Sequence, residues 1–488
     1  MPNFFKLEML FNSVNFLIFF PVVTALYFIL EHKFRWILLL LASCYFYMSF
    51  VPEYIIILFV TIGIDYAAGI LIDQNQGRRR KSFLIASIVA NVGILCVFKY
   101  YNFFIGSFND ILPEQSAMRL PLLQILLPIG LSFHTFQSMS YTIEVYRGHT
   151  KPEMNLGIFS LYVLFYPQLV AGPIERPQNL LNQFHTRKYF DVERVKSGLW
   201  LMLVGFFKKV VIADRLANFV NIVYNDPQSY SGLPVIVAIF FFAIQIYCDF
   251  SGYTDIARGA ARIMGFELMV NFKQPYFAKS LSEFWSRWHI SLSTWFRDYL
   301  YIPLGGNKFG KFKTMRNLFL VFLISGLWHG ASWTFIVWGA MHGIYSVVER
   351  SWMKSNYYVA HFKEKKFAIV SGWVLTMIFV CIAWIFFRAT SFTNAKEICL
   401  SAWKGILNLN NYAIQFRGIG WKPSDLLLSL VLIILLFIFD FFSLKKNVFV
   451  RIRSLPLPVR WAFYYAILFL ILFYSSTDSA QNFIYFQF

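Results

Sequence analysis

Two histidines lie where an imidazole could take part in a reaction. His329 follows Trp328, near the middle of residues 317–348, a stretch that contains no Asp, Glu, Lys or Arg. A neutral imidazole in apolar surroundings can accept a proton from a hydroxyl group, which is general-base chemistry. A core histidine that hydrogen-bonds across helices is the structural alternative. Because ionisable groups inside hydrocarbon are costly, the sequence favours a functional role for His329.

His289 is the second candidate, and its surroundings are mixed. Residues 280–300 place Trp285 and Trp288 at helical spacing among charged side chains, which predicts one amphipathic helix at the cytoplasmic interface. Glu283 and Arg287 are one turn apart and can pair, which leaves His289 without the nearest carboxylate. A catalytic imidazole and the polar face of an interfacial helix remain equal alternatives. We expect two further histidines to be structural: His134 and His342.

Charged side chains in other apolar stretches are weaker candidates. Lys208 and Lys209 fall within residues 198–218, a predicted crossing, and could line a polar tunnel that attracts an anionic or thioester donor. At least one of the two is expected to extend to the membrane interface instead. Asp249 and Asp255 could do acid–base work as a pair, but helix capping explains them equally well.

Metal chemistry and nucleic-acid binding are not expected. The cysteines are scattered and show no spacing typical of zinc, haem or a redox dithiol. The net charge of +19 comes from short basic runs between apolar stretches, as in cytoplasmic loops, and not from a nucleic-acid-binding face.

The composition indicates the class of protein that positions these residues. Of 488 residues, 58% are hydrophobic and 14% charged, and the mean hydropathy is +0.55. These values exclude a soluble multidomain enzyme, a disordered chain and a disulfide scaffold, and they predict an all-α polytopic membrane protein. We expect one integral domain over residues 1–488, with a core at 250–348 and C-terminal helices at 367–488. Apolar runs predict spanning helices at residues 9–30, 36–52, 54–72, 82–98, 120–142, 227–248, 367–387, 425–442 and 461–477.

Two segments do not fit simple crossings. Residues 317–348 are too long for one span and short for two, which predicts a bend or a thinned region of the membrane. Residues 156–174 contain Pro167, Gly172 and Pro173 and lie between basic residues on both sides, which favours a re-entrant segment buried in protein.

The basic residues also predict the topology. The run from Arg78 to Lys81 is expected in the cytoplasm, which puts the N-terminus outside after three crossings. The tail after Ser476 has no basic residue and is also expected outside. The segment 388–424 is assigned outside although it holds five basic residues, which argues against the assignment there. Further cytoplasmic assignments are Lys363, Lys365, Lys366, Lys445, Lys446, Arg451 and Arg453.

The sequence resembles the membrane-bound O-acyltransferase (MBOAT) family, in its alginate O-acetyltransferase-like branch, which also serves cellulose and peptidoglycan acetylation. The most specific matches are the block Glu283–Gly306 and Trp328-His329-Gly330. The other resembling stretches are 165–174, Asp249–Gly265, 271–276 and Leu327–Gly343.

The resemblance implies a fold and a site. The fold is a ring of about 11–13 transmembrane helices around a thinned core, with re-entrant and interfacial helices and a central tunnel. His329 matches the active-site histidine of the family and would be the general base. His289 matches the second histidine of this branch and would position the donor. We assign substrate binding to Trp328, Trp285, Trp288, Asp249, Asn271, Arg297 and Lys208.

The resemblance also implies a reaction and its partners. An acetyl group would pass from a cytoplasmic thioester, acetyl-coenzyme A, to a hydroxyl of an extracytoplasmic polysaccharide, through a periplasmic SGNH-hydrolase-like partner. The expected location is the bacterial inner membrane, with no permanently bound cofactor. Two alternatives remain: D-alanyl transfer to teichoic acid-type polymers, and a transporter of acyl groups or glycans with His329 as a proton relay.

Overall fold

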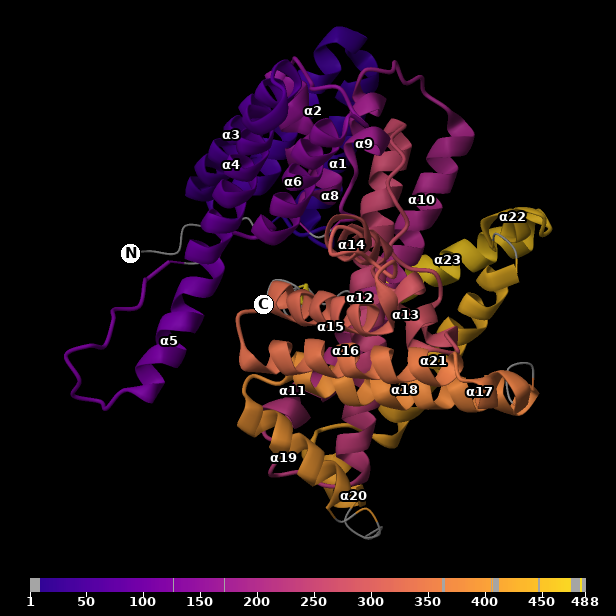
Figure 1. Cartoon of the computed structure of the whole chain (residues 1–488). Helices are drawn as coiled ribbons and strands as arrows, with labels where there is room; N and C mark the ends of the chain where they lie inside the picture. The colour runs from indigo at the N-terminus through magenta and orange to yellow at the C-terminus, as the bar shows by residue number, and fades with distance from the viewer. Residues whose placement is uncertain are drawn as a thin grey trace. The chain divides into compact units, whose positions relative to one another are not determined.

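The computed structural model describes residues 9–125, 127–170, 172–361, 365–404, 406, 412–445, 448–474 and 483–484, and within them it is built from helices (Figure 1). The prediction of an all-α polytopic protein is therefore confirmed. Two compact units make up the chain, one of Met1–Met202 with Tyr253–Met269 and one of Leu203–Gly252 with Val270–Phe488. Lys363 and Lys446, which the sequence assigns to the cytoplasm, lie outside the described residues. The predicted tail after Ser476 also lies outside them, except for residues 483–484.

Six helical stretches in the described part of the chain are long and apolar enough to cross a membrane. The helix over the predicted run 9–30 is shorter, α1 (Val14–Ile29), and is also apolar. The total number of crossings and the side of each terminus remain predictions. The six stretches are Pro52–Gln74, Gly77–Ile111, Leu233–Met264, Lys366–Arg388, Pro423–Leu444 and Leu457–Tyr474.

The prediction of one helix over residues 120–142 is wrong. Only its second half is helical, and Gly130, at φ 76°, precedes the first residue of that helix, α6 (Leu131–Arg147). Pro121 and Pro128 lack the backbone N–H that a helix interior needs, and they fall in the part that is not helical. The apolar composition was therefore a poorer guide than these prolines.

The first unit packs α6 against two long helices, α3 (Ile55–Gln74) and α4 (Gly77–Leu95). Asp65 of α3 is fully buried, and its carboxylate accepts hydrogen bonds from Ser87, Asn91 and Ser138. Neutral donors on α4 and α6 thus stabilise a carboxylate inside the helix packing. The remaining elements of this part are α2 (His32–Met48), η1 (Pro52–Tyr54), η2 (Cys96–Tyr100) and α5 (Tyr101–Ile111).

The predicted irregular segment 156–174 is broken and buried. It forms α7 (Leu156–Leu164) and the short α8 (Tyr166–Leu169), which are separated by Phe165, and α9 (Pro177–Phe184) follows. Side chains from Phe159 to Leu164 are almost completely enclosed by protein. Broken backbone is tolerated at membrane depth when protein surrounds it, so the structure is compatible with the re-entrant prediction.

A continuous helical path covers the predicted crossing 198–218. It consists of α10 (Val192–Phe206), the π-helix η3 (Phe207–Ala213) and α11 (Asp214–Asn225). The next helix, α12 (Leu233–Met264), has 32 residues. Its residues up to Gly252 belong to the second unit and those from Tyr253 to the first. Asp249 and Asp255 lie in the interior of α12, so the capping interpretation of these carboxylates is wrong.

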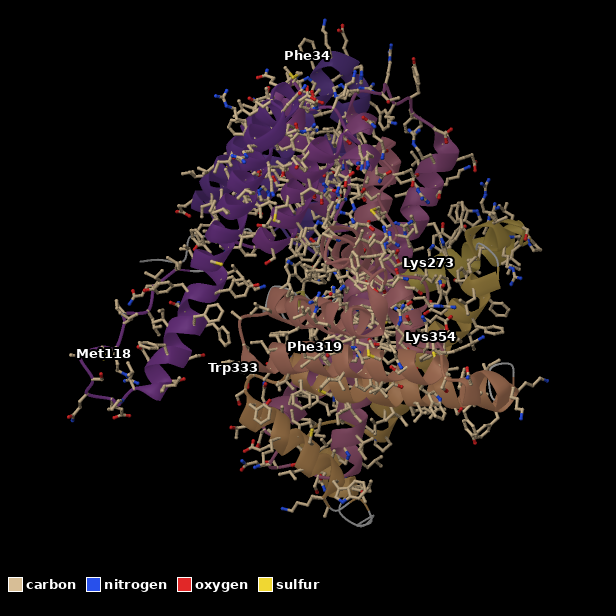
Figure 2. All side chains as sticks on the ribbon, in the orientation of Figure 1. Phe34, Met118, Lys273, Phe319, Trp333 and Lys354 are labelled. Carbon is tan, nitrogen blue, oxygen red and sulfur yellow. The ribbon has the colours of Figure 1, made fainter. Side chains whose placement is uncertain are left out.

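The second unit contains a pair of antiparallel helices where the uncharged stretch 317–348 was predicted to bend. They are α15 (Gly310–His329) and α16 (Trp333–Met353), and Figure 2 labels Trp333 and Lys354 at the two ends of α16. The other elements are η4 (Pro275–Phe277), α13 (Leu281–Arg287), α14 (Ile290–Phe296), η5 (Arg297–Tyr301), α17 (Asn356–His361), α18 (Lys366–Arg388), α19 (Phe392–Trp403), α20 (Tyr412–Gly418), α21 (Pro423–Lys445), α22 (Val448–Arg453) and α23 (Leu457–Tyr474).

Candidate active site

Close backbone contact fixes the turn that carries His329. A Cβ added to Gly326 would lie 2.3 Å from the carbonyl oxygen of Phe335 and 3.0 Å from the Cα of Gly339. Only glycine leaves room for α15 and α16 to approach so closely. Ser332 begins α16 as its N-cap and accepts a hydrogen bond from the backbone N–H of Thr334.

His329 is the last residue of α15 and lies among aromatic rings. Its imidazole centroid is 4.9 Å from Trp328, 5.0 Å from Trp338 and 5.3 Å from Phe387, all edge-on. Its exposed fraction is 5%. The ring is therefore enclosed by aromatic side chains at the end of a helix.

His289 breaks the helix that the sequence predicts over residues 280–300. It has a left-handed backbone, with φ 43° and ψ 55°, and it separates α13 from α14. Such a conformation is uncommon for a residue other than glycine, and strained residues of this kind cluster at functional sites. The prediction of one continuous amphipathic helix is therefore wrong at this histidine.

Asn271 holds the strained turn. Its backbone carbonyl accepts a hydrogen bond from Ile290 N (3.0 Å), and its side-chain Oδ1 accepts one from Ser291 N (3.2 Å). Lys273 N also donates to the carbonyl of Arg287. Asn271, which the sequence assigned to substrate binding, thus makes contacts that position the backbone around His289.

The imidazole of His289 is completely buried. It meets Phe250 edge-on at 4.7 Å between ring centroids, and burial lowers its pKa to about 3. The ring is therefore neutral at physiological pH. Glu283 and Arg287 pair with each other at 2.6 Å, as the sequence predicts, and not with His289.

Trp328 brings the two candidate histidines together. Its indole lies 6.3 Å from the His289 ring and 4.9 Å from the His329 ring, between centroids. Residues 289 and 329 are far apart in the chain, so their common neighbour is a result of the fold. The predicted tunnel and the role of each residue remain predictions.

The other two assigned tryptophans extend this aromatic cluster. Trp285 Nε1 donates a hydrogen bond to His342 Nδ1 at 3.3 Å, which agrees with a structural role for His342. Trp288 is 1% exposed and lies 5.1 Å from Trp384, between ring centroids. Both tryptophans therefore belong to the aromatic packing around the histidines.

The charged candidates of the second unit divide into three cases. Lys209 is buried and bridges Asp249 at 2.6 Å and Asp214 at 2.8 Å, so it does not extend to a membrane interface, and its place in a tunnel stays a prediction. Lys208 is also buried, with its ammonium 5.8 Å from the ring centroid of Tyr247. Arg297 pairs with the adjacent Asp298 at 2.8 Å and keeps 60% of its side chain exposed.

A segment near the C-terminus also lies at this site, and no pattern in the sequence indicates it. The backbone N–H of Ile484 donates to Asp249 Oδ2 at 2.8 Å, and the ring of Phe483 lies 5.7 Å from Phe250. Both residues are buried. Because Phe250 contacts His289, the C-terminal segment forms part of the surroundings of the candidate site.

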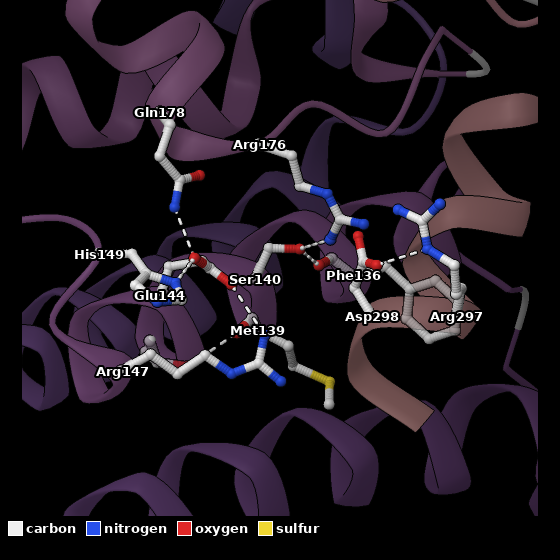
Figure 3. Close-up of polar contacts among 11 residues, drawn as sticks. Phe136, Met139, Ser140, Glu144, Arg147, His149, Arg176, Gln178, Arg297 and Asp298 are labelled. Atoms are coloured by element: carbon white, nitrogen blue, oxygen red, sulfur yellow. Dashed lines mark hydrogen bonds and ion pairs between the residues drawn. The ribbon is translucent and has the colours of Figure 1, made fainter. Parts of the chain in front are cut away.

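A polar cluster at the end of α6 was also missed (Figure 3). Glu144 accepts a hydrogen bond from Gln178 at 2.6 Å and lies 2.9 Å from His149 and 3.1 Å from Arg147. These contacts attach α9 and the segment after α6 to one carboxylate in the first unit. In the described part of the chain, no three His, Cys, Asp or Glu side chains are grouped so as to hold a metal ion.

The fold and the site thus define a multi-pass helical membrane protein with two buried histidines that share an aromatic neighbour. The model of the membrane-bound O-acyltransferase family matches residues 24–393, and the chain belongs to this family. It is therefore an O-acyltransferase.

Three relatives show the range of the family. The chain is 40% identical over 421 residues to the probable alginate O-acetylase of Pseudomonas aeruginosa, covering 86% of this chain and 77% of the relative. It is 35% identical over 439 residues to the peptidoglycan O-acetyltransferase of Helicobacter pylori, covering 83% and 81%. It is 27% identical over 277 residues to the teichoic acid D-alanyltransferase of Bacillus subtilis, covering 54% and 69%.

Proposed function

We propose that the protein transfers an acetyl group from cytoplasmic acetyl-coenzyme A to hydroxyl groups of an extracytoplasmic polysaccharide at the bacterial inner membrane. The observation that carries the proposal is the placement of His289 and His329 around Trp328. A general base and a group that positions the donor must lie close together, and this arrangement provides both.

The reaction divides between the two imidazoles. The hydroxyl oxygen attacks the thioester carbonyl carbon while His329 accepts the hydroxyl proton. The C–S bond then breaks, and the imidazolium of His329 returns that proton to the leaving thiolate. His289 positions the thioester carbonyl, and its held backbone gives it a fixed direction.

The depth of His329 supports transfer across the membrane. Lys311, Lys313 and Arg316 lie near the start of α15, and Arg350 lies near the end of α16, so both far ends of the helix pair are basic. By the positive-inside rule these ends face the cytoplasm. His329 lies at the opposite end of α15, about 28 Å away at 1.5 Å per residue, which approaches the thickness of the hydrocarbon core.

The relatives support acetyl and polysaccharide as substrates. The two with 35–40% identity over most of the chain are named for O-acetylation of alginate and of peptidoglycan. The teichoic acid D-alanyltransferase matches only 54% of the chain, so D-alanyl transfer is the weaker alternative. We further propose that a periplasmic SGNH-hydrolase-like partner takes part in delivery to the polymer, as the resemblance implies.

Membrane vesicles with labelled acetyl-coenzyme A inside and the envelope polymer outside test the proposal. His329→Ala and His329→Gln should each lower transfer by about a hundred- to ten-thousand-fold while the protein stays folded and inserted. His149→Ala is the matched control, because that side chain is 61% exposed and lies in the first unit. Normal acetylation by a folded His329→Ala protein would exclude the general-base role. Movement of label without polymer acetylation would favour a transporter.

A further inference from the structure

A cavity of about 700 Å³ lies in the second unit, away from the histidines in the chain. It is formed by residues 228–231, between α11 and α12, together with residues of α19 and α20, which appear near α11 in Figure 1. Its volume is in the range of small-molecule binding sites. The lining side chains used below are Gln228, Tyr230, Ser231, Glu397, Lys404 and Gln415.

Hydrogen bonds between distant segments build the walls of this cavity. Gln228 Nε2 donates to Glu397 Oε1 at 2.8 Å, and Ser231 N donates to Gln415 Oε1 at 2.8 Å. Gly232 N donates to the carbonyl of Ser401, also at 2.8 Å. The polar side chains are therefore held in place before any ligand arrives, which lowers the cost of binding.

The distribution of charge puts the cavity on the extracytoplasmic side. Helix α18 has a basic residue at each end, Lys366 and Arg388, so it gives no orientation. Arg258 and Arg262 lie in the last turns of α12, whereas the cavity lies before its first residue. The basic end of α12 thus lies away from the cavity, which favours the extracytoplasmic side for the cavity because basic ends face the cytoplasm.

The lining chemistry is that of a sugar site. Amide, hydroxyl and carboxylate groups supply hydrogen-bond donors and acceptors for sugar hydroxyls, and the Tyr230 ring offers an apolar face with a polar end. Lys404 adds a positive charge to the wall. The segment 388–424 is assigned outside although it holds five basic residues, which the positive-inside rule does not expect. A sugar-binding role for Lys404 would explain one of them.

We propose that this cavity binds an acidic saccharide, with Lys404 pairing with a sugar carboxylate and the polar side chains around it binding sugar hydroxyls. The inference rests on the proposed function, because it supplies a place where the acceptor polysaccharide is held near the membrane surface. A polymer held there raises the concentration of acceptor hydroxyls around the transfer site.

Binding of defined sugars to the full-length protein in nanodiscs tests this site. The probes are an oligouronate, a neutral cello-oligosaccharide and an oligomer of N-acetylglucosamine and muramic acid. The oligouronate should bind best, and Lys404→Ala should weaken that binding about tenfold or more. Lys396→Ala is the matched control, because Lys396 is an exposed lysine of α19, the helix that Lys404 directly follows, and it does not line the cavity. Equal binding of acidic and neutral sugars, or of the wild type and Lys404→Ala, would overturn the proposal.

A second measurement separates this site from the catalytic proposal. His329→Ala should abolish acetyl transfer and leave oligouronate binding unchanged. Lys404→Ala should leave acetyl transfer to a small soluble alcohol unchanged but lower transfer to the polymer. Binding of an extracytoplasmic protein that depends on Lys404, with no sugar binding, would identify the cavity as a protein-docking site and contradict the saccharide assignment.

Discussion

The indole ring of Trp328 meets the imidazole of His289 at 6.3 Å between centroids, with an interplanar angle of 64°. Trp328 immediately precedes His329 in α15, so one side chain of this helix packs near the rings of both candidate histidines. An aromatic side chain that packs against both rings restricts their positions. The site is therefore organised by packing as well as by polar contacts.

Substitutions of His289 should separate its chemistry from its backbone conformation. His289→Asn and His289→Gly tolerate positive φ, so they should fold with melting temperatures close to that of the wild type, whereas His289→Ala should lose about 1–2 kcal/mol more. All three should lose most acetyl transfer. Thermal unfolding in detergent and a vesicle transfer assay measure the two effects. Full activity in the asparagine variant would show that only the turn is needed.

Gly326 should be intolerant of any side chain. Alanine would place its Cβ 2.3 Å from a backbone oxygen, and backbone atoms cannot move as a flexible side chain can. Gly326→Ala should destabilise the protein by about 1–3 kcal/mol or more and displace His329, so transfer should fall as well. Gly63→Ala is the control, because nothing lies within 4 Å of its added Cβ. Equal melting temperatures for the two variants would contradict the close approach of α15 and α16.

The sequence predicted features that depend on local composition. The uncharged stretch with His329 had to bend because it is too long for one span. The break at His289 was not predictable in the same way, because helical spacing continues through Trp288 and Ile290. The contact that holds it comes from Asn271, which no local pattern connects to that turn.

The partners of the buried charges also depend on the fold. Asp249 was compatible with helix capping because aspartate is a preferred capping residue, yet it pairs with Lys209, 40 positions earlier. Ion pairs between distant helices leave no periodic signal in one sequence. Pro121 and Pro128, in contrast, are visible in the sequence and argue against a helix over 120–142. The prediction of that helix followed the apolar composition instead.

Substitutions of Lys209 and Asp249, which form a buried ion pair, should have strongly non-additive effects on the free energy of unfolding. Asp249→Ala removes one partner of a buried lysine and the acceptor of the Ile484 N–H, so it should cost about 3–5 kcal/mol. Asp249→Asn keeps an acceptor for Ile484 and should cost less. A double-mutant cycle with Lys209→Met, followed by thermal unfolding, should give a coupling energy above about 1 kcal/mol. Additive effects of the two substitutions would mean that the pair contributes no coupling.

Glu175 should make the stability of the first unit depend on pH. Its side chain is fully buried and accepts hydrogen bonds from Met269 N at 2.5 Å and Asn179 Nδ2 at 2.6 Å. Burial raises its pKa from 4.5 to about 7, despite these hydrogen bonds, which lower the pKa. Between these two values the unfolded chain has lost the proton that the folded chain still holds. Folding stability should therefore be greatest below about pH 4.5 and fall as the pH rises to about 7.

The expected loss over that pH range is on the order of 3 kcal/mol, because each unit of pKa difference corresponds to about 1.4 kcal/mol. Glu175→Gln keeps a polar side chain that cannot ionise, so its melting temperature should change less with pH than that of the wild type. Glu193→Gln is a matched control, because that carboxylate belongs to the same unit and keeps 54% of its side chain exposed. Thermal unfolding of the purified wild type and of each variant from pH 4.5 to 7.5 measures the effect. If the wild type and Glu175→Gln show the same slope over this range, Glu175 is not the titrating group.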